Sequence, residues 1–234
     1  MKKIIPIRFD GYMQSGGSTK PWRVVAISDE GGNRQEVAYV VKTFTATQVK
    51  QANNIAKEFI CNALAAQFDL DVPEACLINL HDEDFKATLG EAALSVLSIK
   101  HTGNTFASRL LANATIINEE VRGGSFGITE CATLFAFDCL IINLDRGGHR
   151  NKPNLLVDDE GFFLIDHELT FYFIDGESED GYFKILENFD SNVWPHFYQK
   201  HLFYSRLKGF KGSKKGLFDT FEESLRTLIR FSNL

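Results

Sequence analysis

The chain has 234 residues, of which 44% are hydrophobic and 24% are charged, so it can form one large domain or two small lobes. Its net charge of −6 argues against broad affinity for nucleic acids or anionic membranes. No apolar run approaches the roughly 20 residues that span a bilayer, and the N-terminal apolar run is too short for a signal peptide. The four cysteines form no C-x-x-C pair. We therefore expect a cytoplasmic protein with free thiols, without membrane contact and without a direct nucleic-acid partner.

The first 44 residues have the pattern of β-structure. Apolar and β-branched runs predict short strands over residues 4–9, 22–28 and 36–44. Small residues let successive backbone N–H groups approach an anion, and such residues fill the loop after the first strand. They are Ser15, Gly16, Gly17 and Ser18. A surface turn explains the same composition equally well.

A lysine and a glutamate stand out in the next segments. Lys42 lies inside the third predicted strand, where an ammonium is costly to bury without a partner. The clearest helical stripe of the chain covers residues 47–68, and Glu58 adjoins it. Taken alone, Lys42 is also explained as an edge residue facing water, and Glu58 as a solvated helix residue.

The middle of the chain contains a short strand and a long helix. The strand is predicted over residues 75–80, and the helix over residues 129–144. Asp138 falls within the apolar pattern of this helix. We expect it to be buried and to accept hydrogen bonds in a structural role.

The most informative stretch is 135–173, which indicates a helix, a polar loop and a hairpin. The helix leads into Asp145, and two apolar runs flank an Asp-Asp-Glu-Gly turn. Their pairing would bring Asn154, just before the first run, close to Asp166, just after the second. Amide and carboxylate oxygens suit a hard cation such as Mg²⁺. Asp145 could then receive a proton or orient a hydroxyl, which makes the stretch a candidate phosphoryl-transfer site.

Three motifs in this stretch resemble those of the HipA-like kinases, a branch of the protein-kinase-like fold. They are N-x-D-R at residues 143–146, N-L-L beginning at Asn154, and I-D-H ending at His167. The resemblance implies that Asp145 is the catalytic aspartate and that Asn154 and Asp166 bind the metal. It also implies ATP as the phosphoryl donor and Mg²⁺ as cofactor.

The loop between the catalytic aspartate and the metal-binding asparagine departs from the kinase pattern. In H-R-D-x-x-x-x-N that step is about five residues. Here Asn151 follows Asp145 by six positions and Asn154 by nine. Both asparagines are therefore candidates. We favour Asn154, because the sequence Asn-Leu-Leu continues directly into the predicted strand.

The resemblance extends to the N-terminal part of the chain. The strand end V-V-K resembles the kinase V-A-I-K, whose lysine holds the ATP phosphates and pairs with a helix glutamate. Carried over, Lys42 contacts ATP and Glu58 orients it. The S-G-G-S segment resembles a Gly-Gly-Ser segment near the start of many HipA-like kinases. This implies ATP contacts from residues 15–18 and makes the loop serines candidates for autophosphorylation.

The fold that the resemblance implies is α+β and two-lobed, within a single HipA-like kinase domain over residues 1–234. A small antiparallel β-lobe would occupy residues 1–100, and a mostly helical lobe residues 101–234. The connecting hinge is expected near residues 98–104, with adenine contacts from a strand over 94–99. Further helices are predicted at residues 183–189, 193–203 and 217–230.

The implied function is ATP- and Mg²⁺-dependent phosphoryl transfer to a Ser or Thr hydroxyl on a protein. Three alternatives remain open: a small-molecule kinase, an ATP-binding pseudokinase that acts as an interaction module, and a toxin-like kinase held by an antitoxin or regulatory partner.

Overall fold

A computed structural model describes residues 1–13, 20–117, 126–147, 153–159, 161–171, 174–176, 187 and 198–232. The described residues form an α+β structure, as expected. They divide into two compact units: Met1–Phe59 with Pro73–Ala112, and Ile60–Val72 with Asn113–Leu234. The expected division at residue 100 differs from this one, because the unit that begins the chain extends to Ala112.

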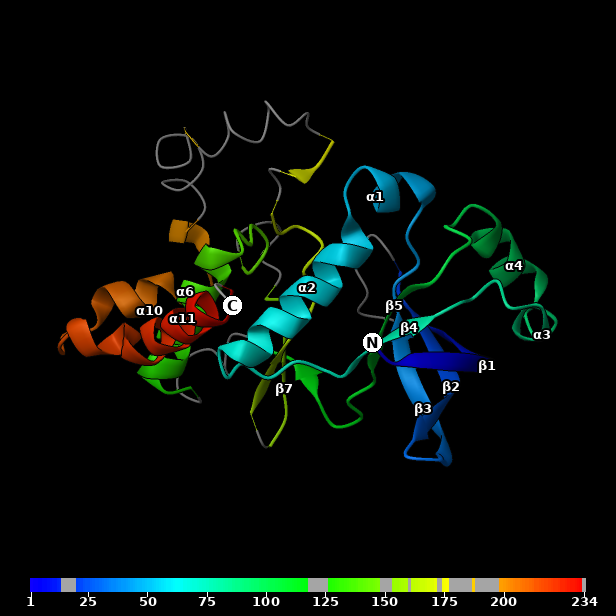
Figure 1. The fold of residues 1–234 in the computed structure, drawn as a ribbon, viewed down its shortest axis with the longest axis horizontal. Helices are drawn as coiled ribbons and strands as arrows, with labels where there is room; N and C mark the ends of the chain where they lie inside the picture. The colour runs from blue at the N-terminus through cyan, green and yellow to red at the C-terminus, as the bar shows by residue number, and fades with distance from the viewer. Residues whose placement is uncertain are drawn as a thin grey trace. The chain divides into compact units, whose positions relative to one another are not determined.

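Unit 1 is built on a closed barrel of five strands in the order β1-β2-β3-β5-β4 (Figure 1). The expected sheet was antiparallel, and this is wrong for one pair, because β1 and β4 run parallel. The chain reaches β4 through a long helical connection that follows β3. This connection lets β4 run in the same direction as β1, whereas a tight turn would reverse the chain. The strand bounds are β1 Lys3–Tyr12, β2 Trp22–Glu30, β3 Asn33–Val41, β4 Ala75–Ile78 and β5 Thr105–Arg109.

The predicted helix over residues 47–68 is two helices. The first, α1 (Ala46–Lys50), begins at a capping box in which Thr45 and Gln48 bond each other's backbone N–H groups. The second, α2 (Asn54–Gln67), follows Asn53, whose left-handed backbone (φ +52°) interrupts the helical path. The residues of α2 up to Phe59 belong to unit 1, and the remainder belong to unit 2.

The expected strand over residues 94–99 is wrong. This segment belongs to α4 (Glu91–Ser98), which follows the short helix α3 (Glu83–Lys86). Ala93 and Leu97, one helical turn apart, are buried in the core of the barrel unit, so the apolar spacing is that of a helix. Residues 98–104, where the hinge was expected, run from the end of α4 to the start of β5. Strand β5 pairs with both β3 and β4.

Unit 2 contains a helical core and a small sheet in the order β6-β7-β8. In Figure 1, α10 and α11 lie against α6, and these helices share one apolar core. The hairpin of β7 and β8 matches the predicted runs, whereas β6 was not predicted. The bounds are β6 Thr115–Ile116, α6 Ile128–Leu140, β7 Leu155–Val157, β8 Phe162–Leu164, the 3₁₀ helices η2 Tyr198–Lys200 and η3 Lys215–Phe218, α10 Tyr204–Gly209, and α11 Asp219–Ser232.

Two of the predicted C-terminal helices can be compared with the structure. The helix expected over 217–230 corresponds to α11. The one expected over 193–203 is described only from residue 198, where η2 is followed by non-helical residues before α10 begins. Of the helix predicted over 183–189, the structure describes residue 187 alone.

All four cysteines are free, as expected. Cys61, Cys76 and Cys131 are buried in the apolar cores. Burial raises the pKa of the Cys131 thiol to about 11, so it behaves as a small apolar side chain.

Candidate active site

Lys42 and Glu58 form a buried ion pair within unit 1. Lys42 Nζ donates to Glu58 Oε1, and the two side chains are only 10% and 2% exposed. Lys42 immediately follows the last residue of β3, and Glu58 lies on α2. Two buried charges of opposite sign offset part of each other's cost of leaving water. The structure thus brings these two predicted residues together, and neither one is solvated.

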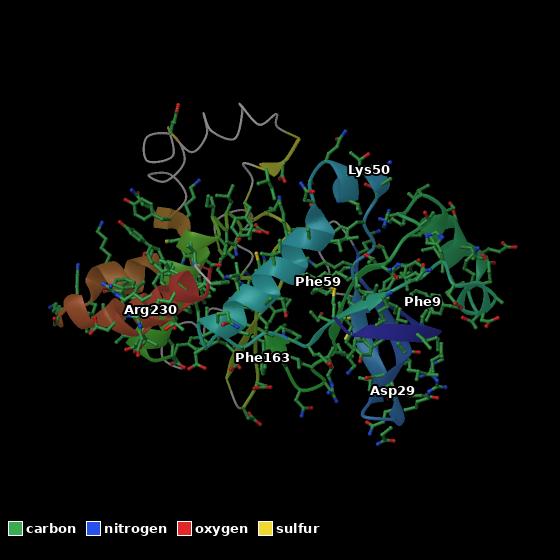
Figure 2. The ribbon with its side chains drawn as sticks, viewed as in Figure 1. Phe9, Asp29, Lys50, Phe59, Phe163 and Arg230 are labelled. Carbon is green, nitrogen blue, oxygen red and sulfur yellow. The ribbon has the colours of Figure 1, made fainter. Side chains whose placement is uncertain are left out.

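Strand β5 fixes the backbone of Lys42. Its N–H donates to the carbonyl oxygen of Phe106 (3.1 Å), and its own carbonyl accepts from the Thr105 hydroxyl (2.7 Å). The ring of Phe106 also packs edge-on against Phe59, with centroids 5.0 Å apart. Figure 2 labels Phe59 on α2. Phe59 adjoins Glu58, so β5 positions both members of the ion pair.

Asp145 and Asn154 meet within unit 2. Asn154 Nδ2 donates to Asp145 Oδ2 at 3.0 Å, although nine positions separate the residues. Both are buried. The loop that leads to Asp145 is held by Asn143, whose Oδ1 accepts the Asp145 N–H at 3.1 Å. The hydrogen bond fixes which end of the Asn154 amide faces Asp145.

Asn154 and Asp166 lie at the two ends of the β7–β8 hairpin. The strands pair with Leu155 opposite Leu164, and the Ile165 N–H donates to the Asn154 carbonyl at 3.2 Å. Asn154 and Asp166 both have left-handed backbones, with φ +45° and +65°. Such conformations cost about 1–3 kcal/mol each in residues with a side chain and concentrate at functional sites.

A buried arginine connects the loop to the hairpin. Arg146 is fully buried and makes a two-pronged contact with Asp138 of α6, through Nε to Oδ2 (2.7 Å) and Nη2 to Oδ1 (3.2 Å). Its Nη1 donates to the carbonyl oxygen of Asn154 and, at 3.5 Å, to that of Ile165. The guanidinium of Arg146 therefore pairs with a buried carboxylate.

Asp138 is buried and structural, as predicted. Besides Arg146, it accepts hydrogen bonds from Asn143 Nδ2 (2.8 Å) and from His201 Nε2 (2.9 Å). Burial alone raises the pKa of the Asp138 carboxyl, but the charge of Arg146 and the hydrogen bonds of Arg146 and His201 outweigh it. Together they hold that pKa well below its ordinary value. Asp138 is therefore the ionised centre of a buried polar network.

The segment that follows Asp166 is also anchored. The carbonyl of His167 accepts from the Thr170 hydroxyl at 2.7 Å, and that hydroxyl lies 3.4 Å from Cys61 Sγ on α2. His167 and Thr170 are both buried. Within the described part of the chain, no group of three or more His, Cys, Asp or Glu side chains could hold a metal ion.

Residues 15–211 match the family model described as HipA-like kinase. The chain belongs to the HipA-like kinase family. No curated protein was found to match it. Family membership indicates a kinase and, as for kinases in general, the use of ATP. Where the structure describes the chain, none of its helices has the length and apolarity needed to cross a membrane.

Several residues that we predicted for the site of this HipA-like kinase lie outside the described residues. They are Ser15, Gly16, Gly17 and Ser18 of the small-residue loop, and Asn151, the other candidate metal ligand. Conversely, sequence reasoning missed His201. Nothing in its surrounding sequence indicates that it contacts Asp138, which lies 63 positions earlier.

Two side chains of this HipA-like kinase have the chemistry that a magnesium ion needs. Asp166 would offer a carboxylate, and Asn154 would offer an amide oxygen, because its Nδ2 is committed to Asp145. Mg²⁺ prefers oxygen ligands and usually takes only one or two from protein carboxylates, with phosphate and water completing its shell. Asn154 and Asp166, at the two ends of one hairpin, are therefore suited to hold this cation.

Proposed function

We propose that this HipA-like kinase transfers the γ-phosphoryl group of ATP to a Ser or Thr hydroxyl of a protein in a Mg²⁺-dependent reaction. The hydrogen bond between Asn154 and Asp145 is the main support. Despite the lengthened loop, the asparagine at the hairpin start reaches the aspartate at the loop start. That contact favours an active kinase over a pseudokinase.

Each predicted residue has a distinct role in the proposal. Lys42 would bind the α- and β-phosphates of ATP, and its ion pair with Glu58 would hold the ammonium in place. Asn154 and Asp166 would bind Mg²⁺, which neutralises negative charge on the phosphates when bound. The loop residues Ser15, Gly16, Gly17 and Ser18 would contribute contacts to the phosphates.

Asp145 would orient the acceptor hydroxyl and take its proton. The hydroxyl oxygen forms a bond to the γ-phosphorus while the bond from that phosphorus to the β–γ bridging oxygen breaks, and ADP leaves with the electron pair. The proton of the hydroxyl passes to the Asp145 carboxylate. Positioning and charge stabilisation account for most of the catalysis of such transfers.

We also propose that the two units correspond to the lobes of a protein-kinase-like fold. Three observations support this. The barrel has the strand order β1-β2-β3-β5-β4, and the residue after β3 pairs with a glutamate on the following long helix. The second unit supplies the loop of Asp145 and the hairpin of Asp166.

The test is incubation of the pure protein with Mg²⁺ and γ-labelled ATP, read by intact mass and phosphopeptide mapping. Asp145→Asn and Asp166→Asn should abolish labelling while leaving the fold intact. Asp159→Asn is the matched control, because Asp159 is exposed in the turn of the same hairpin. This control should label like the wild type.

The outcomes separate the alternatives. Label in the wild type and in Asp159→Asn, but not in the other two variants, would establish the phosphotransferase and identify an acceptor. ATP binding without label, even after a panel of protein and small-molecule acceptors, would favour the pseudokinase. Absence of ATP binding would refute the proposal, and activity retained in Asp145→Asn or Asp166→Asn would overturn the residue assignment.

A further inference from the structure

His201 contacts the polar network of the site from a distant part of the chain. It lies just after η2, is buried, and its ring packs edge-on against Phe135 of α6 with centroids 5.0 Å apart. Its Nδ1 accepts the N–H of Phe203 at 3.1 Å. The ring proton must therefore be on Nε2, which donates to Asp138 Oδ2 at 2.9 Å.

The hydrogen bond from His201 fills the last acceptor position of the Asp138 carboxylate. This carboxylate accepts four hydrogen bonds, two from Arg146, one from Asn143 and one from His201. Four is about the full acceptor capacity of a carboxylate. Loss of the His201 donor would leave one lone pair of a buried oxygen unsatisfied, and the carboxylate could then rotate against the guanidinium.

Arg146 transmits the position of Asp138 to the hairpin. Through Nη1 it donates to the carbonyls of Asn154 and Ile165. One of these belongs to a candidate metal ligand, and the other directly precedes Asp166. The guanidinium thus holds the backbone at both ends of the hairpin, where the left-handed conformations occur.

Leu202, the residue after His201, makes a second contact with Arg146. The Leu202 N–H donates to the Arg146 carbonyl at 2.9 Å. The 201–202 segment therefore contacts Arg146 at its backbone directly and at its side chain through Asp138. Two points of contact resist rotation of the arginine better than one.

We propose that His201 is a positioning residue for the magnesium site, acting through Asp138 and Arg146 on the backbone of Asn154 and Asp166. The inference rests on the proposed function, because it assigns these two residues to the metal. Residues that orient metal ligands typically change metal affinity about 10–100-fold when substituted. The alternative is a purely structural role, in which the ring of His201 only fills space beside Phe135.

Two substitutions separate the donor from the ring. His201→Phe keeps an aromatic ring beside Phe135 but removes the Nε2 donor. His201→Gln removes the ring but places an amide N–H near the position of Nε2. If the donor matters, Gln should restore what Phe loses; if only packing matters, Phe should be the milder change.

The experiment measures the Mg²⁺ concentration that gives half of the ATP-dependent rise in melting temperature, for the wild type and both variants. This readout needs no turnover. Phosphoryl transfer is measured alongside, to separate the Mg²⁺ requirement from the limiting rate. We expect His201→Phe to raise the half-saturating Mg²⁺ concentration about tenfold or more, and His201→Gln to remain within about threefold of the wild type.

Each result is decisive. If His201→Phe has the Mg²⁺ requirement of the wild type, the proposal is overturned while the proposed function stands. If the wild type itself shows no Mg²⁺-dependent binding of ATP, the proposed function fails first. Should His201→Phe not fold, His201→Asn replaces it, since its shorter amide lies near Nδ1 rather than Nε2. If every variant without the donor unfolds, His201 is structural and the proposal is wrong.

Discussion

Asn154 and Asp166 occupy the two ends of one hairpin, and both adopt left-handed backbone conformations. Neither residue is glycine, so each left-handed conformation costs conformational free energy. The two residues flank strands that pair over only three positions. Asparagine and aspartate tolerate this region better than other residues with a side chain. The conformations turn the chain at both ends of the hairpin, where Arg146 binds the adjacent carbonyls.

The left-handed conformation of Asn154 predicts an unusual order of stability among its variants. Asn154→Gly and Asn154→Ala both lose the hydrogen bond to Asp145, but only glycine adopts φ +45° without strain. The alanine variant should therefore be less stable than the glycine variant by about 1 kcal/mol in urea denaturation. Asp159, whose φ is not positive, is the control position. There the Asp159→Ala variant should be at least as stable as the Asp159→Gly variant. Equal stability of the Asn154 variants would refute the strain argument.

Gly147 lies between the candidate catalytic loop and the segment of His201. It has φ +86°, and a Cβ atom there would lie 3.0 Å from the backbone nitrogen of Leu202 and 3.2 Å from its Cα. Gly176 has a similar φ of +64°, but among the described residues nothing lies within 4 Å of the position that a Cβ atom would take there. Both alanine variants are strained by about 1 kcal/mol, but only Gly147→Ala also displaces the Leu202 backbone. We expect Gly147→Ala to be the less stable by a further 1 kcal/mol or more.

Thermal denaturation of these two glycine variants gives the comparison directly. The Leu202 N–H that would be displaced donates to the Arg146 carbonyl. Gly147→Ala should therefore also weaken phosphoryl transfer, whereas Gly176→Ala should not. Equal losses of stability in both variants would mean that the contact with Leu202 adds nothing.

The residues that could be predicted from sequence are those whose partners lie within a recognisable local pattern. Lys42 stands out as a cation among apolar strand residues, and Asn154 and Asp166 stand out as polar ends of a hairpin. Asp138 was recognisable as a carboxylate at a buried helix position. In each case the polar residue interrupts an apolar periodicity, and burial then demands a partner.

The parts that could not be predicted depend on contacts between distant segments. His201 lies in the segment predicted as a helix over residues 193–203, but its hydrogen bond to Asp138 is set by tertiary packing, which no local pattern reveals. The break between α1 and α2 depends on the left-handed Asn53, which no stripe of apolar residues reveals. The apolar run 94–99 is short enough to fit a strand or a helix, and its packing against the barrel decides for the helix.

The Lys42–Glu58 ion pair gives a prediction about stability that is independent of catalysis. Replacing one member of a buried pair leaves the other charge without its partner, which typically costs 3–5 kcal/mol. Lys42→Met should therefore destabilise the fold by about 3 kcal/mol or more, measured by urea denaturation. The double variant Lys42→Met/Glu58→Leu should recover at least about 1 kcal/mol, although neither protein would hold ATP phosphates. Additive losses in the double variant would show that the pair is not coupled.

The depressed pKa of Asp138 predicts how the stability of the protein depends on acid. The folded protein holds this pKa below the value of about 4 that the unfolded chain has. The ionised carboxylate therefore stabilises the fold fully above pH 4, and this contribution is lost as the pH falls through the folded pKa. Asp138→Asn removes the titrating group while keeping its shape.

At pH 7, Asp138→Asn should be destabilised by about 3 kcal/mol, because Arg146 loses its buried counter-charge. Below pH 4 the unfolded wild-type chain protonates Asp138 while the folded protein keeps it ionised, so this contribution falls progressively until the folded carboxyl protonates as well. The difference in unfolding free energy between the two proteins should therefore shrink as the pH is lowered from 5 toward 2. Other carboxylates titrate equally in both proteins, so the difference isolates Asp138. A gap that stays constant over this range would show that Asp138 is not the ionised centre of the network.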